Sequence, residues 1–422
     1  MTHFQAGRPA EAESAYRAAL AMVPADPAIT HNLGVAIAAQ GRHRDAVSYF
    51  EETLRVDPDF VSAHYNRAVA LLRLGETQEA IKAFDRAAKL EPQHYQAHRA
   101  LGFLWLAQGE RGQALDHLAR TYELRRGDDR TTIALKSLTT ATRHKLEHDA
   151  EQFSYLAQRT RDRLRFELLS RSYRAVAEQL ANELTTLSEA QIDVLGDDYN
   201  TPIHLHAAPE VAGSAVTERA DRDALAVQFD QHGAVFVDDL LTPQALDSLR
   251  RFLLESTIWH DFSHIEGFVA SYLEDGLACP LLLQIADDLR RAFPEILGQH
   301  PLSQAWAFKG LQPQAAVDVH ADDAAVSVNF WVTPTEANLN PGHGGLIVCR
   351  ALPPDDWEIK DYGADQARIV TFLEQKAEDS LVVPYRQNRA VLFRSRLFHH
   401  SDHPEFASGY ENHRINLTLL YG

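Results

Sequence analysis

Residues of the types that bind iron follow one another in a characteristic order near the end of this chain. His320 and Asp322 form a His-x-Asp pair, and His399 follows much later. Two histidines and one carboxylate can occupy one face of Fe(II) and leave the other face open for a co-substrate and O₂. Arg414 comes shortly afterwards and could hold a carboxylate of that co-substrate by a bidentate ion pair. The order therefore predicts a metal site with an anion site beside it.

Alternation along an extended chain helps to choose among neighbouring candidates. Residues two apart point to the same side, so His320 and Asp322 could reach one metal ion, whereas Asp323 points away. Alternation alone does not say whether His399 or His400 faces inward. A His-x-Asp pair taken by itself is most often part of a surface loop, so the prediction depends on the elements around it.

Short apolar runs separated by turn residues surround these candidates. A helix is expected at 242–255, and the runs are 233–241, 326–332, 345–350, 380–385, 390–394 and 415–421. Many short strands with turns between them predict a β-sandwich or jelly roll. Arg414, just before the last run, shares one polar face with Asn416 and Thr418, and we expect this face to line the interior. The alternate apolar face would pack against the outside.

The first third of the chain repeats with a fixed period. Glycine, alanine, an aromatic residue and proline each recur 34 residues apart. The positions are Gly7, Gly41, Gly75 and Gly109; Ala12, Ala46, Ala80 and Ala114; Tyr16, Phe50 and Phe84, with Leu118 in the fourth place; and Pro24, Pro58 and Pro92. The pattern resembles the tetratricopeptide repeat, a pair of helices that stacks into a solenoid. We expect the glycines in turns with positive φ. The first copy begins partway through its first helix, so either the native protein is longer or its first repeat is altered.

A solenoid of this kind presents a concave groove to partners, and the resemblance implies a peptide or protein partner. Asn32 and Asn66 occupy equivalent positions in successive repeats, and Ala100 stands there in the third. Their amides could hydrogen-bond an extended peptide backbone. Alternatively, they face water or favour the first helical turn.

The whole C-terminal pattern resembles the Fe(II)/2-oxoglutarate-dependent dioxygenases, in particular a bacterial group that also carries tetratricopeptide repeats. The resemblance rests on the His-x-Asp pair and the segments VSVNFWV, LFHHSDH and HRINLTLLYG. It implies a double-stranded β-helix, with Fe(II) bound by His320, Asp322 and His399. The motif Leu-Phe-His-x-Ser/Thr-Asp favours His399 over His400. 2-Oxoglutarate and O₂ are the implied co-substrates.

The resemblance also assigns residues to the co-substrate. Arg414 would bind the far carboxylate of 2-oxoglutarate. Many members of the family have Arg-x-Ser where this chain has Arg414-Ile-Asn416, so Asn416 would have to supply the second hydrogen bond. Asn329 shares a strand face with Trp331 and would contact 2-oxoglutarate or substrate. The alternative is an interior amide bonded to the backbone.

These patterns predict an α-solenoid, a helical connector and a C-terminal jelly roll. The expected boundaries are 1–127 for the repeats, 128–195 for a helical capping and connector region, 196–224 for a linker, and 225–422 for the dioxygenase domain. The implied activity is hydroxylation of a peptide or protein that the repeats recruit, in the manner of prolyl hydroxylases. A small-molecule oxygenase, or a repeat scaffold whose oxygenase domain is inactive, are the alternatives.

Composition excludes several other classes of protein. The 422 residues carry a net charge of −18, which disfavours non-specific binding to nucleic acid or an anionic membrane. Cys279 and Cys349 do not make a disulfide framework, so a reducing cytoplasm is expected. No apolar run approaches the length of a transmembrane helix, and no signal peptide is expected.

Overall fold

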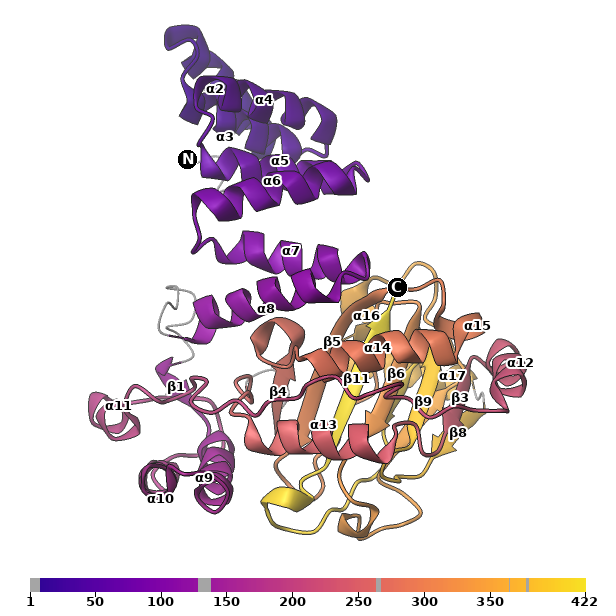
Figure 1. Cartoon of the computed structure of the whole chain (residues 1–422). Coiled ribbons are helices and arrows are strands. Elements are labelled where there is room, and N and C mark those ends of the chain that lie inside the picture. Colours follow the sequence, from indigo (N-terminus) through magenta and orange to yellow (C-terminus); the bar gives the residue numbers. More distant parts are fainter. Residues whose placement is uncertain (1–7, 128–137, 263–266, 364, 377–378) are drawn as a thin grey trace. The chain divides into compact units, whose positions relative to one another are not determined.

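The computed structural model describes residues 8–127, 138–262, 267–363, 365–376 and 379–422 (Figure 1). The chain divides into two compact units, Met1–Leu124 and Arg125–Gly422. Gly7 of the repeat register and the first ten residues of the expected connector, 128–137, lie outside the described residues. Among the described residues, no helix has both the length and the apolar character needed to cross a bilayer.

Helices make up the first unit. They are α2 (Pro9–Met22), α3 (Pro27–Ala38), α4 (His43–Val56), α5 (Val61–Arg73), α6 (Thr77–Leu90), α7 (Tyr95–Ala107) and α8 (Arg111–Arg126), the last of which extends just past the boundary. The turns within each repeat contain Gly41, Gly75 and Gly109, with φ of 79°, 78° and 78°. These values confirm the expectation of positive φ at the repeated glycine.

The other repeated residues form the core of this unit. Ala46, Ala80 and Ala114 are fully buried. Phe50 packs so closely on α3 that a Cβ atom placed on Gly34 would come within 2.7 Å of its ring. Alanine and glycine at these positions therefore let neighbouring helices approach, and the aromatic residue fills the space between them.

Two antiparallel sheets organise the second unit. The larger sheet has the strand order β3 (Ala234–Val237), β9 (Ala390–Arg394), β6 (Val326–Trp331), β11 (Ile415–Tyr421), β5 (Leu302–Gly310) and β4 (Phe268–Tyr272). The smaller has the order β10 (His399–Ser401), β7 (Leu346–Cys349) and β8 (Ser380–Val383). The C-terminal region is thus rich in sheet, as expected, and β4, β5 and β10 lie outside the runs expected to form strands.

Helices cover the outer face of the larger sheet (Figure 1). They include α13 (Pro243–Glu255), which matches the helix expected at 242–255, and α14 (Pro280–Ala292). The hydroxyl of Tyr421 on β11 donates to the carbonyl of Ala286 on α14 over 3.0 Å. The apolar face of β11 therefore packs outward against helices, and its polar face is left for the interior. The remaining helices of this region are α12 (Arg222–His232), α15 (Pro294–Leu297), α16 (Ile359–Gly363) and α17 (Gln366–Lys376).

The helices expected as a connector belong to the same compact unit as the sheets. They are α9 (Arg143–Ala157), α10 (Arg163–Ala177) and α11 (Glu189–Leu195), with the short strands β1 (Thr140–Ala141) and β2 (Thr185–Thr186). Gln152 of α9 donates to the carbonyls of Leu254 and Ser256 at the end of α13. The segment expected as a linker, 196–224, runs without helix or strand until α12, and side chains of α14 accept two of its backbone N–H groups.

Candidate metal centre

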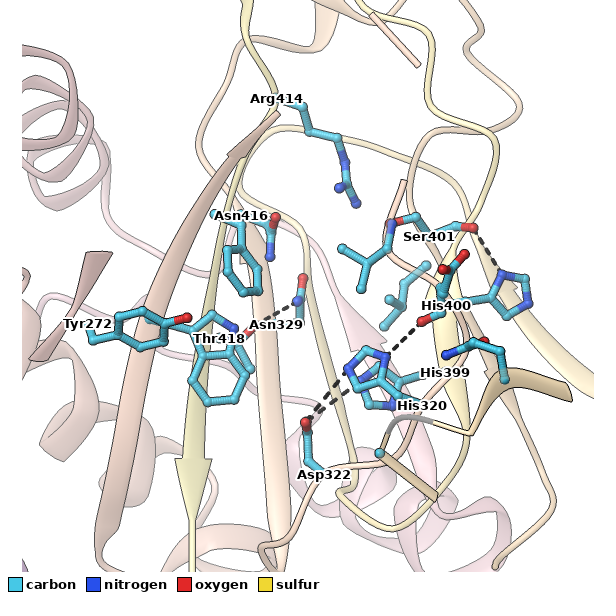
Figure 2. A pocket seen from close by; sticks show the side chains of 17 residues that line it. Tyr272, His320, Asp322, Asn329, His399, His400, Ser401, Arg414, Asn416 and Thr418 are labelled. Carbon is cyan, nitrogen blue, oxygen red and sulfur yellow. Dashed lines mark hydrogen bonds and ion pairs between the residues drawn. The ribbon is translucent and has the colours of Figure 1, made fainter. Parts of the chain in front are cut away.

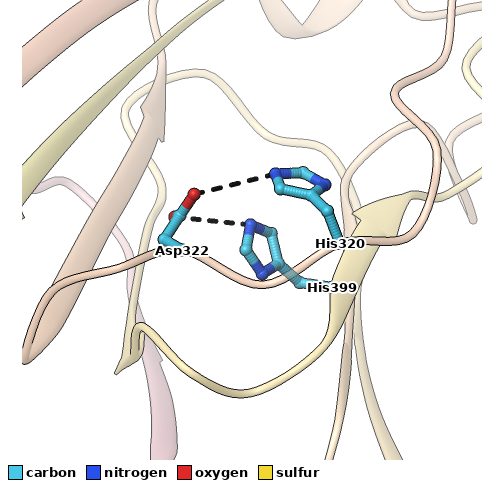
Figure 3. Close-up of side chains that lie close together, drawn as sticks. All are labelled: His320, Asp322 and His399. Atoms are coloured by element: carbon cyan, nitrogen blue, oxygen red, sulfur yellow. Dashed lines mark ion pairs between the residues drawn. The ribbon is translucent and has the colours of Figure 1, made fainter. Parts of the chain in front are cut away.

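His320 and His399 are brought together by the backbone. They form an isolated antiparallel bridge in which each backbone N–H donates to the carbonyl of the other, over 3.1 Å and 2.8 Å. Their imidazole rings lie 4.3 Å apart between centroids. Asp322 follows two residues after His320 on the segment that leads into β6, so its carboxylate reaches the same point (Figure 3).

The ligand atoms of these residues have the separations that a metal ion needs. Nε2 of His320 lies 3.8 Å from Oδ1 of Asp322, and Nε2 of His399 lies 3.6 Å from Oδ2. Bonds of about 2.1 Å to one ion place neighbouring ligand atoms about 3–4 Å apart. Among the described residues, only these three form a group of His, Cys, Asp or Glu side chains with ligand atoms within 4.8 Å of one another. Its donor set fits Fe(II).

Hydrogen bonds orient both imidazoles for metal binding. Nδ1 of His320 lies 2.8 Å from the carbonyl oxygen of Asp318, and Nδ1 of His399 lies 3.0 Å from that of Leu397. A proton on each Nδ1 satisfies these carbonyls and leaves the lone pair of Nε2 facing the site. Burial lowers the pKa of His399 to about 4, so its ring is neutral, as a ligand must be.

A hydrogen bond from a buried serine orients the carboxylate of Asp322. The hydroxyl of Ser327 on β6 donates to Oδ2 of Asp322 over 2.9 Å. The same hydroxyl lies 2.9 Å from that of Ser395, and both serines are fully buried. Asp323, the neighbour that alternation disfavoured as a ligand, is exposed. His400 is half-buried at the pocket wall, and its Nδ1 faces the carbonyl of Ser401.

The three residues line a pocket of about 570 Å³ between the two sheets (Figure 2). Arg414, Asn329, Asn416 and Thr418 also line it, as expected from the alternation along their strands. The register places them side by side, because Asn416 pairs with Trp331 and Thr418 pairs with Asn329 across β11 and β6. The polar face of β11 therefore forms one wall of the pocket.

The guanidinium of Arg414 is buried and its hydrogen-bond partners are neutral carbonyl groups. It is 5% exposed, and its Nε and Nη2 donate to the carbonyls of Gly344 and Gly345 over 3.0 Å and 3.1 Å. No carboxylate pairs with it among the described residues. Burial lowers its pKa to about 10, which still leaves the guanidinium charged at neutral pH. A charged group in this position is suited to an anionic ligand such as a carboxylate.

The glycines next to Arg414 have a specific steric role. Gly344 has φ of 83°, and a Cβ atom on Gly345 would lie 1.9 Å from the carbonyl oxygen of Val383. Only glycine lets this turn pack against β8 and present both carbonyls to the guanidinium. The turn therefore fixes the direction in which Arg414 points.

Several polar atoms of the pocket lack a partner. Nδ2 of Asn329 donates to Oγ1 of Thr418 over 2.9 Å, but Oδ1 of Asn329 and Oδ1 of Asn416 are buried without a hydrogen bond. Buried polar groups are rarely left in this state, so the pocket fits a polar ligand. The amides of Asn329 and Asn416 are thus available near Arg414. The alternative for Asn329, an amide bonded only to backbone, is not what the structure has.

Sequence reasoning missed the other side of the pocket. Tyr272, Trp306 and Phe308 line it from β4 and β5. The alternation of Trp306 and Phe308 with small residues in LSQAWAFKG could have indicated a strand with one aromatic face. No sequence pattern points to Ser327, because its role follows only from its contact with Asp322.

In the first unit, the two asparagines expected in the groove are both half-buried. Nδ2 of Asn66 lies 2.9 Å from Nε2 of His31 in the preceding repeat. Its amide is therefore engaged within the unit.

Comparison with known proteins concerns the first unit. The family model of the tetratricopeptide repeat matches residues 1–59, 38–90 and 65–129. Among solved structures, MamA is 20% identical, with 42% of this chain and 91% of that chain covered and a TM-score of 0.28. The first tetratricopeptide domain of human RPAP3 is 23% identical, with 27% and 85% covered and a TM-score of 0.24. The first such domain of Spaghetti (RPAP3), bound to an HSP90 peptide, is 23% identical, with 25% and 85% covered and a TM-score of 0.25.

No curated protein matches the sequence. The family match covers the region in which glycine, alanine, aromatic residues and proline recur with one period. The N-terminal part of this chain is an array of tetratricopeptide repeats.

Proposed function

We propose that the second unit is an Fe(II)- and 2-oxoglutarate-dependent dioxygenase. The observation that carries the proposal is one pocket that contains both the cluster of His320, Asp322 and His399 and the unpaired guanidinium of Arg414. A metal site alone would fit many reactions. A metal site with a buried cation beside it fits a reaction in which a dicarboxylate binds to both.

Each residue has a defined task in this proposal. His320, Asp322 and His399 would hold Fe(II) on one face, and Ser327 would orient the carboxylate. Arg414, aimed by the carbonyls of Gly344 and Gly345, would hold the far carboxylate of 2-oxoglutarate. When bound, Fe(II) with 2-oxoglutarate and O₂ supplies the oxidation of an unactivated C–H bond, with succinate and CO₂ as co-products.

The surrounding chain would keep water away from this chemistry. Phe393 lies 4.6 Å from the ring of His399 between centroids and is fully buried. The two sheets enclose the pocket on opposite sides. Asn329 and Asn416 would hydrogen-bond the co-substrate or the substrate, with Asn416 in the place that serine occupies in many members of the family.

The repeats favour a peptide or protein as the substrate. Tetratricopeptide arrays are surfaces that bind other proteins. The repeats of this chain would therefore recruit the polypeptide on which the pocket acts. Hydroxylation of a side chain in a recruited protein is therefore our first candidate. Hydroxylation of a small molecule by the same residues is the alternative within enzymes.

A scaffold without turnover is the second candidate function. The observation that favours it is the identity of Asn416, which stands two residues after Arg414, where many active members have serine. In this case the repeats would bind partners and the second unit would bind ligand without reaction.

An anaerobic titration of the metal-free protein with Fe(II) and 2-oxoglutarate tests the proposal. We expect the visible charge-transfer band of the chelate, and its loss in His399→Ala. His400→Ala is the matched control, because it removes the adjacent imidazole and should keep the band. Succinate formation would then separate the enzyme from the scaffold. A folded, metal-loaded protein that gives no band contradicts the dioxygenase.

A further inference from the structure

Three aromatic side chains from neighbouring strands line one part of the pocket, which we call the aromatic wall: Tyr272, Trp306 and Phe308. Tyr272 on β4 pairs directly with Trp306 on β5, so both side chains lie on the same face. Phe308 follows two residues after Trp306, and their rings are 6.3 Å apart between centroids. Tyr272 and Trp306 are only partly buried, so parts of their rings remain open to the pocket.

The aromatic wall stands apart from the residues proposed for the metal and the co-substrate. Figure 2 shows Tyr272 on the side of the pocket away from His320, Asp322 and His399, with Asn329 and Thr418 between them. Arg414 lies at a third position, away from both. The space next to the aromatic wall is therefore left for a different ligand, which would be the substrate.

Negative charges lie near Tyr272 and also on the His320 side of the pocket, across from the aromatic wall. Asp318 lines the pocket, is exposed, and has no cationic partner among the described residues. Burial, reinforced by the negative charges of Asp261 and Glu274, raises the pKa of Tyr272 well above its usual value. Among the lining residues, Arg414 is the one that carries a permanent positive charge. An anionic substrate would be repelled here, whereas a cation would be attracted both to the ring faces and to the carboxylates.

Building on the dioxygenase assignment, we propose that the substrate presents a cation of the ammonium type, which binds against the aromatic wall and faces Asp318 across the pocket. The rings supply the negative faces of their quadrupoles, and Asp318 supplies a full negative charge from the His320 side of the pocket. Such a cation can belong to a lysine side chain of a polypeptide or to a free amine. Both share the chemistry that the pocket selects.

Choline and its neutral carbon isostere, in which carbon replaces the quaternary nitrogen, test this proposal. Their binding to metal-free protein is measured by isothermal titration calorimetry, so the result does not depend on the metal or on turnover. We expect choline to bind at least about tenfold more tightly than the isostere, as a desolvated cation–π contact predicts. Equal binding of the two, or tighter binding of the isostere, overturns the proposal and indicates an apolar substrate.

Variants locate the binding. Trp306→Leu should abolish the preference for choline, Trp306→Phe should keep most of it, and Asp318→Asn should weaken choline binding severalfold without affecting the isostere. Trp105→Leu is the matched control, because Trp105 is a partly buried tryptophan of the repeats. A preference for choline that survives Trp306→Leu in a folded protein would place the cation elsewhere and refute the role of the aromatic wall.

A second pair of ligands distinguishes the two sources of the cation. A glycine-flanked lysine peptide is compared with butylamine and with the same peptide carrying norleucine in place of lysine. Tighter binding of the lysine peptide than of both indicates a polypeptide, and equal binding of peptide and butylamine indicates a free amine. Absence of the band with Fe(II) and 2-oxoglutarate, together with a clear preference for choline, would remove the dioxygenase and leave a cation-binding pocket.

Discussion

The hydroxyl of Ser327 donates a 2.9 Å hydrogen bond to Oδ2 of Asp322, the carboxylate oxygen that also faces Nε2 of His399. Both partners are buried, so no water can replace this bond without a rearrangement of the strand. The contact fixes the rotation of the carboxylate relative to the two imidazoles.

Ser327→Ala should weaken metal binding by roughly 10–100-fold, the usual effect of losing an outer hydrogen bond to a ligand. Anaerobic calorimetry with Fe(II), or with Mn(II) as a stable substitute, measures it. Ser271→Ala is the matched control, because Ser271 is equally buried but bonds to the carbonyl of Asp275. Equal metal affinity in wild type and Ser327→Ala would show that Asp322 does not depend on this bond.

Arg414→Lys should lower the affinity for 2-oxoglutarate by about 10–100-fold and leave metal affinity unchanged. Lysine keeps the charge but lacks the planar fork that can bond a carboxylate and the carbonyls of Gly344 and Gly345 together. Titration of 2-oxoglutarate into Mn(II)-loaded protein gives the affinity. Arg389→Lys, in which the arginine pairs with Asp238 outside the pocket, serves as the control. Loss of metal binding in Arg414→Lys would mean that the turn, and not the anion site, has been damaged.

Lys309→Met should raise the free energy of unfolding near neutral pH by about 1–3 kcal/mol. Lys309 is fully buried, its Nζ has no hydrogen-bond partner, and it lies 3.3 Å from the ring centroid of Tyr410. Burial lowers its pKa well below the ordinary 10.5. In the unfolded chain the amine binds a proton below 10.5, whereas in the folded chain it does so only at lower pH. The free energy of unfolding of the wild type therefore falls as pH decreases from 10.5 towards the pKa of Lys309 in the folded protein. Lys309→Met should not show this decrease, because methionine does not titrate.

Urea unfolding at several pH values checks this prediction for Lys309. Exposed Lys82→Met, which loses only a surface pair with Glu79, should not change the pH dependence of stability between neutral pH and 10.5. A less stable Lys309→Met would show that attraction to the Tyr410 ring outweighs the cost of burying the amine.

Gly75→Ala should destabilise the repeats by about 1 kcal/mol, because alanine at φ of 78° meets the steric cost of the left-handed region. Gly112→Ala is the control, and it should stabilise the repeats slightly. Gly112 lies in α8, nothing surrounds the position of its missing Cβ, and alanine favours helix. Thermal unfolding followed by circular dichroism compares the two. Similar losses in both would argue that the glycine of the turn has no special conformational role.

The repeats could be predicted almost completely from the sequence, because each unit contacts mainly its neighbours and the period reports those contacts. The spacing of His320 and Asp322, and the polar face from Arg414 to Thr418, were also readable from alternation within single strands. The pairing of His320 with His399 was only implied by resemblance. A local sequence pattern carries no information about a backbone bridge between two residues so far apart in the chain.

The aromatic wall and the buried lysine could not be predicted for the same reason. Trp306, Phe308 and Lys309 are close in sequence, yet the first two face the pocket and the third faces Tyr410. Their environments depend on β5 lying between β11 and β4, and strand order is set by contacts across the whole unit. The fit of 196–224 against α14 is likewise a tertiary effect.

The reciprocal backbone bridge between His320 and His399 means that folding itself sets the spacing of two ligands. An arriving ion would find their main chains already in register, so little conformational entropy is left to lose when it binds. The amide protons of these two residues should therefore exchange slowly with solvent even in the metal-free protein. The metal site is therefore preorganised, and the positions of the two histidines should persist after a chelator removes the ion.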